Sequence, residues 1–99
     1  MKKYNIRILP RGLNDIKNAS QYYEEQKTGL GQKFNIEVKN AVEIIKVYPF
    51  FQFRYDDVRC LSLSRFPYML HYSVNEKNNT VYIHAVIHTS LNPEENWIE

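Results

Sequence analysis

The sequence predicts one α+β domain, in which a helical hairpin covers one face of an antiparallel sheet in the order β-α-α-β-β-β. Between residues 10 and 47, apolar side chains recur every three or four positions, which is the period of a helix. From residue 59 to residue 88 they recur at every second position, which is the period of a strand. A chain of 99 residues has room for a single core. We therefore assign residues 1–99 to one domain.

The first two elements are a strand and a helix. Over residues 4–9, Tyr4, Ile6 and Ile8 share one face, as in a half-buried strand. Pro10 ends that strand and favours the first turn of a helix. The apolar stripe of this helix extends over about four turns and consists of Leu13, Ile16, Ala19 or Ser20, and Tyr23. The glycines within residues 28–31 are typical of a helix end.

A second helix follows after a short link, so the two helices should form an antiparallel hairpin. Its main stripe consists of Leu30, Phe34, Val38, Ala41, Val42 and Ile45. The helix should end at Tyr48, because a residue that precedes proline is disfavoured in the helical region. Ile36, Ile44 and Val47 lie off the main stripe. Either the stripe is wide, or these three residues form a second surface that contacts a partner.

An aromatic linker at residues 50–53 leads into the strands. The predicted strands, each with one apolar and one mixed face, are residues 59–64, 68–75 and 81–88. Residues 65–67 form the first turn between them. Residues 76–79 form the second, where asparagine suits the positive φ of a hairpin turn.

Composition restricts the class of protein. The net charge of +2 is too small for nucleic-acid binding to follow from charge alone. The single cysteine, Cys60, excludes an internal disulfide framework. No run approaches the ~20 apolar residues of a membrane span, and Asn5 and Arg7 interrupt any signal peptide. We expect a cytoplasmic protein without a membrane segment. Because so short a chain buries only about 60 to 65% of its unfolded surface, a partner or a homodimer contact would add stability.

Four segments of the chain carry a family resemblance when they are taken in order. They are Tyr4 to Pro10 before a helix ending in Tyr22-Tyr23-Glu24, Leu30-Gly31-Gln32-Lys33-Phe34, Val58-Arg59 before Arg65-Phe66-Pro67-Tyr68 and Tyr72, and Val86-Ile87-His88 before Asn92-Pro93 and Trp97. Over nearly its whole length the chain resembles the RelE/ParE superfamily of bacterial type II toxins. The Arg-Phe-Pro-Tyr turn and the Pro-x-x-x-Trp ending are similar to the ParE-like branch.

This resemblance implies a small toxin that a cognate antitoxin holds inactive. ParE-like members poison DNA gyrase without cutting nucleic acid, whereas RelE-like members cut mRNA in the ribosomal A site. A third alternative is a toxin-fold protein that has lost its target activity. The fold by itself does not choose among these functions.

The strands favour the protein-binding function. Cleavage of RNA requires cations for a charged transition state, and RelE-like relatives supply them mainly from the sheet. Met69 and Leu91 stand in this sequence where such relatives carry arginine. We therefore expect a ParE-like toxin that inhibits a protein target such as gyrase, with no cofactor and no metal. Three histidines without a second cysteine or well-spaced carboxylates are a weak metal signal.

The nuclease alternative has its own candidate residues. By alternation His71, His84 and His88 share the mixed face of the sheet with Ser62 and Met69. A two-residue loop at Lys77-Asn78 would place His71 opposite His84, where the pair could act as acid and base. The candidate catalytic residues, if the protein is a nuclease, are His71, His84, His88 and Arg59. The alternative is that these histidines are ordinary sheet residues bonded to Ser62 or Ser73.

Two further sets of residues are expected to bind partners. The target-binding candidates are Arg59, Arg65, Tyr68 and Trp97. The antitoxin-binding candidates are Ile36, Ile44, Val47 and Phe51. Each arginine also has a structural interpretation: Arg59 would pair with Asp56 or Asp57, and Arg65 would solubilise its turn. Trp97 would similarly anchor the chain on the helical hairpin.

Overall fold

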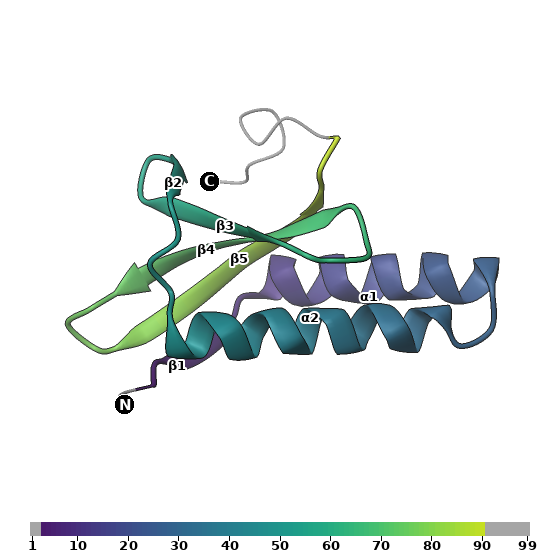
Figure 1. Cartoon of the computed structure of the whole chain (residues 1–99), viewed down its shortest axis with the longest axis horizontal. Helices are drawn as coiled ribbons and strands as arrows, with labels where there is room; N and C mark the ends of the chain where they lie inside the picture. The colour runs from purple at the N-terminus through teal and green to yellow at the C-terminus, as the bar shows by residue number, and fades with distance from the viewer. Residues whose placement is uncertain (1–2, 91–99) are drawn as a thin grey trace.

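The computed structural model describes residues 3–90, and the predicted α+β class is confirmed. Trp97 and Leu91 lie outside the described residues. The elements are β1 (Asn5–Ile8), α1 (Pro10–Gln26), α2 (Leu30–Val47), β2 (Phe53–Tyr55), β3 (Val58–Ser62), β4 (Tyr68–Asn75) and β5 (Thr80–His88). Strand β2 is an addition to the predicted order, and it begins at Phe53, the last residue of the expected aromatic linker. Figure 1 shows both helices packed on one side of the sheet.

The sheet has five strands in the order β1-β5-β4-β3-β2. Strand β1 pairs in parallel with β5, and the other neighbours are antiparallel. The prediction of a wholly antiparallel sheet is therefore wrong at one edge. A parallel pair needs a long connection, and both helices and three strands separate β1 from β5 in the chain.

The core lies between the helices and the sheet. Its fully buried large side chains include Phe34, Ile45, Leu70, Tyr72, Val81 and Ile83. The predicted stripe of α1 is wrong at Leu13, whose exposed fraction is 54%. Gly12 faces the sheet instead, and a Cβ on it would lie 3.1 Å from the carbonyl oxygen of Ile83. Because the Leu9 amide donates to that same oxygen at 2.9 Å, the rotation of α1 is fixed at its first turn.

The link between the helices is closed by a side chain of α1. The Glu24 carboxylate accepts hydrogen bonds from the backbone amides of Gly29 and Gly31 at 3.0 to 3.1 Å. These amides open α2, whose first turn would otherwise lack acceptors. Gly29 has a φ of 91°, which favours glycine. The predicted antiparallel hairpin is confirmed, and Gly31 packs directly against Ser20 and Glu24 of α1.

The pairing of β4 with β5 contains a bulge that changes which side chains share a face. Tyr72 pairs with Ile83, but His71 pairs with Ala85, so His84 is an extra residue in β5. The prediction that His71 lies directly opposite His84 is therefore wrong. Pairing ends at Asn75 and Thr80, so the loop has the four residues 76–79. Asn79 has a φ of 56°, as expected for asparagine in such a turn.

None of the helices within residues 3–90 combines the length and the apolar character that crossing a membrane requires.

Candidate functional site

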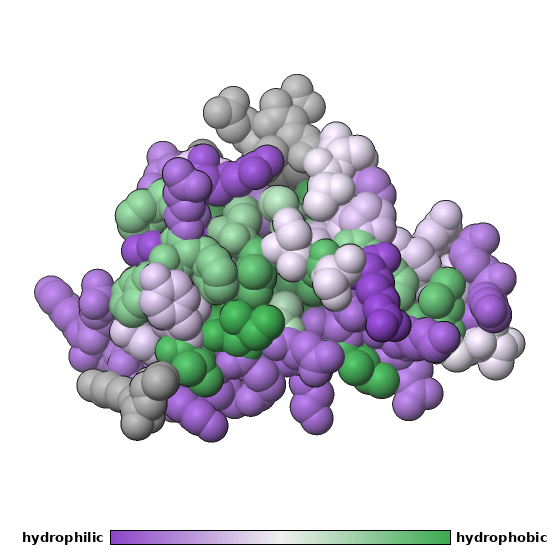
Figure 2. Space-filling model, viewed as in Figure 1, coloured by the Kyte–Doolittle hydropathy of each residue, from purple (hydrophilic) through white to green (hydrophobic). Residues whose placement is uncertain are grey.

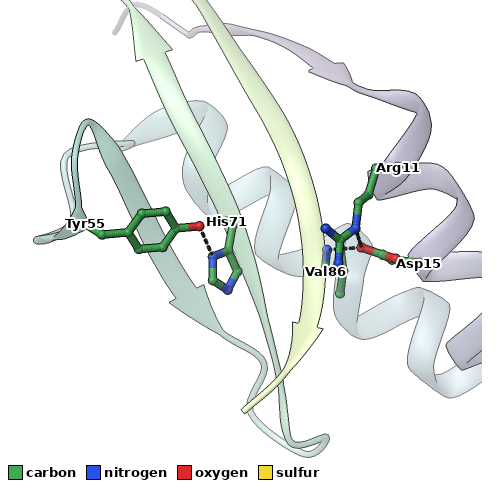
Figure 3. A network of polar contacts seen from close by, with 5 residues as sticks. All are labelled: Arg11, Asp15, Tyr55, His71 and Val86. Carbon is green, nitrogen blue, oxygen red and sulfur yellow. Dashed lines mark hydrogen bonds and ion pairs between the residues drawn. The ribbon is translucent and has the colours of Figure 1, made fainter. Parts of the chain in front are cut away.

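His71 lies on the face of the sheet that is opposite the helices. Leu70 and Tyr72, its neighbours in β4, belong to the core under the helices, and successive strand residues point to opposite faces. The exposed fraction of His71 is only 1%. A hydrogen bond of 2.9 Å joins its Nδ1 to the Tyr55 hydroxyl, and Figure 3 shows the two side chains pointing toward one another.

This environment keeps His71 uncharged at neutral pH. Burial lowers the pKa of His71 to about 4, and the positive charges of Arg54 and Arg11 act in the same direction. Burial also raises the pKa of the Tyr55 hydroxyl to about 12, so this group retains its proton. A base with a pKa near 4 is a weak proton acceptor, because general-base catalysis is most efficient when the pKa lies near the working pH.

His84 shares this face but occupies the bulge. Its Nε2 lies 2.7 Å from the Ser73 hydroxyl, within hydrogen-bond distance. Burial lowers the pKa of His84, and Asp57 opposes that change. The contact with Ser73 agrees with the structural alternative for the histidines. Cys60 pairs with His71 across β3 and β4, and burial raises the pKa of its thiol to about 11, which leaves the thiol protonated.

His88 lies on the helix side, contrary to the alternation of the sequence. The extra residue at His84 reverses the faces beyond the bulge. The ring centroid of His88 lies 5.2 Å from that of Tyr68 in an edge contact. Both rings border a cavity of about 310 Å³ together with Arg11, Asp15, Asn18 and Tyr22 of α1. The three histidines therefore do not form one catalytic face.

Asp15 and Arg11 fasten α1 to the strand beyond the bulge. Asp15 Oδ2 accepts a hydrogen bond from the Val86 amide at 3.0 Å and lies 3.3 Å from Nε of Arg11. Figure 3 shows the Asp15 carboxylate between the Arg11 side chain and the backbone of Val86 in β5. We did not predict this contact. The spacing of four residues could have indicated the ion pair, but not the bond to Val86, 71 residues away.

Arg59 is engaged by the aromatic segment before β2. Its Nη1 donates to the Phe51 carbonyl at 2.7 Å, and its Cζ lies 3.9 Å from the centroid of the Phe53 ring. Among residues 3–90, neither Asp56 nor Asp57 forms an ion pair with it. The structural role of Arg59 is thus to hold the chain between α2 and β2, through a backbone carbonyl and a cation–π contact.

Arg65 lies in an exposed turn that α2 holds in place. Glu37 Oε1 accepts hydrogen bonds from the Ser64 hydroxyl at 2.8 Å and from the amides of Ser64 and Arg65 at 3.1 and 3.2 Å. The Ser64 hydroxyl is the main cause of a lowered pKa at Glu37. This carboxylate, which we did not single out in the sequence, fixes the position of Arg65. Tyr68, four residues after Ser64, packs its ring against Tyr23 and Phe34.

The antitoxin-binding candidates of α2 lie on its outer surface. The exposed fractions are 49% for Ile36, 50% for Ile44 and 40% for Val47. Phe51 is partly buried and its ring contacts Tyr48. Figure 2 shows separate hydrophobic patches among hydrophilic side chains on the lower part of the molecule, where Figure 1 places α2. These three residues of α2 therefore lie outside the core, so a wide core stripe does not explain them.

Within residues 3–90 the histidine, cysteine and carboxylate side chains form no cluster of three that could hold a metal ion.

Comparisons with known proteins give fold-level matches. No family model matches the sequence, and no curated protein matches it. A chain of the chromosomal ParDE toxin–antitoxin system from P. aeruginosa aligns with a TM-score of 0.65 and 16% identity, over 87% of this chain and 96% of its own. A chain of the RelBE2 toxin–antitoxin complex from Mycobacterium tuberculosis aligns with a TM-score of 0.63 and 16% identity, over 87% of this chain and 98% of its own.

This protein has the RelE/ParE toxin fold. The fold that the resemblance implied is therefore confirmed. The two solved structures represent both branches at equal identity, and hence they do not distinguish a ParE-like from a RelE-like activity.

Proposed function

We propose that this protein is the toxin of a type II toxin–antitoxin module, which binds and inhibits a protein target such as DNA gyrase and which a cognate antitoxin neutralises. The fold supports the first part, since both compared chains come from toxin–antitoxin systems. A single observation supports a binding toxin over a nuclease. The histidines that would act as acid and base are a buried neutral His71, a bulged His84 and a His88 on the other face.

The exposed arginine Arg65 favours binding of a protein target over catalysis. Arg65 is exposed at a turn that Glu37 holds in position. Glu37 holds the backbone of Arg65, and the exposed guanidinium can bind a carboxylate with two parallel hydrogen bonds. Arginine is over-represented among the residues that dominate protein interfaces. Met69 pairs with Ile87 on the sheet, at the position where a nuclease would place a cation.

We expect Arg65→Ala to weaken inhibition of gyrase supercoiling, so that about ten times more protein is needed for half-inhibition, because an interface arginine is lost. We expect His84→Ala to stay within about twofold of the wild type, since no proton transfer depends on it. Inhibition is measured in a supercoiling assay with purified protein. Cleavage of mRNA is measured in parallel in a translating extract.

Circular dichroism of each variant excludes misfolding as the cause, and Arg65→Lys tests whether charge without the planar fork is sufficient. Cleavage of mRNA by the wild type, with a loss of about 10² to 10⁴ in rate in His84→Ala, would identify an endoribonuclease. If the protein shows neither activity, the third alternative, a toxin-fold protein that has lost its target activity, would be favoured.

The antitoxin should cover the outer surface of α2. We expect Ile44→Asp to weaken antitoxin binding at least tenfold, a rough figure for forcing a charge into an apolar contact. The antitoxin to test is the product of a small reading frame adjacent to the gene, if the gene has such a neighbour, and calorimetry gives the affinity. Unchanged affinity in a natively folded variant would show that this part of α2 lies outside the interface.

A further inference from the structure

A cavity of about 420 Å³ lies between the first half of α2 and the turn that joins β3 to β4. It is lined by Leu30, Lys33, Ile36, Glu37, Arg65 and Phe66. Its size falls in the range of pockets that hold small ligands, so it has room for a large apolar side chain. Glu37 bonds the turn to α2, and these hydrogen bonds join the two walls of the cavity.

The apolar part of this cavity is ready to receive a hydrophobic group. Phe66 is anchored from behind, with its ring centroid 4.8 Å from Tyr23 and 5.2 Å from Phe34. Ile36 stands at the opening with half of its surface exposed. Covering such apolar area is favourable by roughly 25 cal/mol per Å².

The charged groups at the opening select an acidic partner. Lys33 and Arg65 are both exposed and both line the cavity. The carboxylate between them belongs to Glu37, and its Oε1 already accepts hydrogen bonds from Ser64 and Arg65. Two cations against one internally bonded carboxylate leave a net positive opening, which complements negative charge on the partner.

Ile36 belongs both to the wall of the cavity and to the exposed row of α2, which also contains Ile44 and Val47. Ile36, Ile44 and Val47 are 8 and 3 residues apart, so they lie on the same side of the helix. At 1.5 Å per residue the row extends about 16 Å from Ile36 to Val47. This length matches about three turns of a second helix laid along α2, and such helices bind through apolar residues at this spacing.

We infer that the cavity receives one large apolar side chain from an acidic, helical segment of the antitoxin, which then continues along the row to Val47. This inference rests on the proposed function, since the antitoxin is its occupant. The bound segment would also lie over Arg65. Antitoxin and target would then compete for the same turn, and this competition is how the toxin would be neutralised.

The test compares Ile36→Asp and Lys33→Glu with the matched variant Lys39→Glu, which makes the same charge change at an exposed position of α2 outside the cavity. Calorimetry with the antitoxin should show a loss of about 30-fold for Ile36→Asp, as for an interface hot spot. It should show about tenfold for Lys33→Glu, and within about twofold for Lys39→Glu. Added NaCl should weaken wild-type binding more than that of Lys33→Glu.

The second measurement is the amount of antitoxin that restores supercoiling by gyrase. It should rise for Ile36→Asp in proportion to the lost affinity. Wild-type affinity for both Ile36→Asp and Lys33→Glu, while Ile44→Asp still weakens binding, would overturn this inference and leave the proposed function intact. An antitoxin that does not bind the wild-type protein would instead overturn the proposed function.

Discussion

Gly31→Ala should lower the free energy of unfolding by about 2 kcal/mol. A Cβ at this position would lie 2.6 Å from the carbonyl oxygen of Ser20 and 3.0 Å from Cβ of Glu24. The first of these atoms is backbone, so the helices must separate at this position. Overpacking of this kind costs about 1 to 3 kcal/mol and more against backbone, while alanine regains up to about 1 kcal/mol of helix propensity. Urea denaturation followed by circular dichroism measures the difference.

The neighbouring exposed residue provides the control for this prediction. Gln32→Ala changes the same turn of α2 without adding an atom between the helices, and its effect should stay within about 0.5 kcal/mol. If Gly31→Ala proved as stable as Gln32→Ala, the close approach of the two helices would be wrong.

Acidification should destabilise the protein through His71. The unfolded chain binds a proton on this histidine near its ordinary pKa of 6.5, whereas burial lowers the folded pKa to about 4. Stability is thus unaffected by His71 above pH 6.5 and is lost progressively as the pH falls toward 4. Since each pKa unit corresponds to about 1.4 kcal/mol, the loss between pH 7 and pH 4 is about 3 kcal/mol. Urea midpoints across this range measure it.

His71→Asn isolates this contribution from that of other groups. The asparagine oxygen can accept a hydrogen bond from the Tyr55 hydroxyl, as Nδ1 of a neutral histidine can when Nε2 carries the proton, but asparagine does not titrate. His84 faces the same side with a lowered pKa, and Asp57, Arg54 and Arg11 also act on this region, so the variant retains their pH dependence. The variant should therefore lose about 3 kcal/mol less than the wild type. Parallel profiles for the two proteins would contradict a buried neutral His71.

The helical half of the fold could be predicted because its signals are local. Pro10, the glycines near residue 29 and the proline after Tyr48 act through the backbone of adjacent residues. Helix α1 begins at Pro10 and ends three residues before Gly29, and α2 ends one residue before Tyr48. The exposed row Ile36, Ile44 and Val47 was also visible in the sequence, because helical spacing alone separates it from the core stripe. Rotation of α1, by contrast, depends on the carbonyl of Ile83, 71 residues from Gly12, and for this reason Leu13 was placed wrongly.

The candidate site depended on contacts that residue spacing does not contain. Alternation gave the faces of His71 and His84, but one extra residue in β5 moved His88 to the helix side and His71 opposite Ala85. A bulge is stable only where the rest of the fold satisfies the backbone beside it, here through Asp15 and the Val86 amide. The bond from Arg59 to the Phe51 carbonyl and the attachment of Arg65 to Glu37 likewise join distant segments. The ionisable side chains that could bind or react were evident from their residue types. Their partners and faces were set by long-range packing, which leaves no periodic signal in the chain.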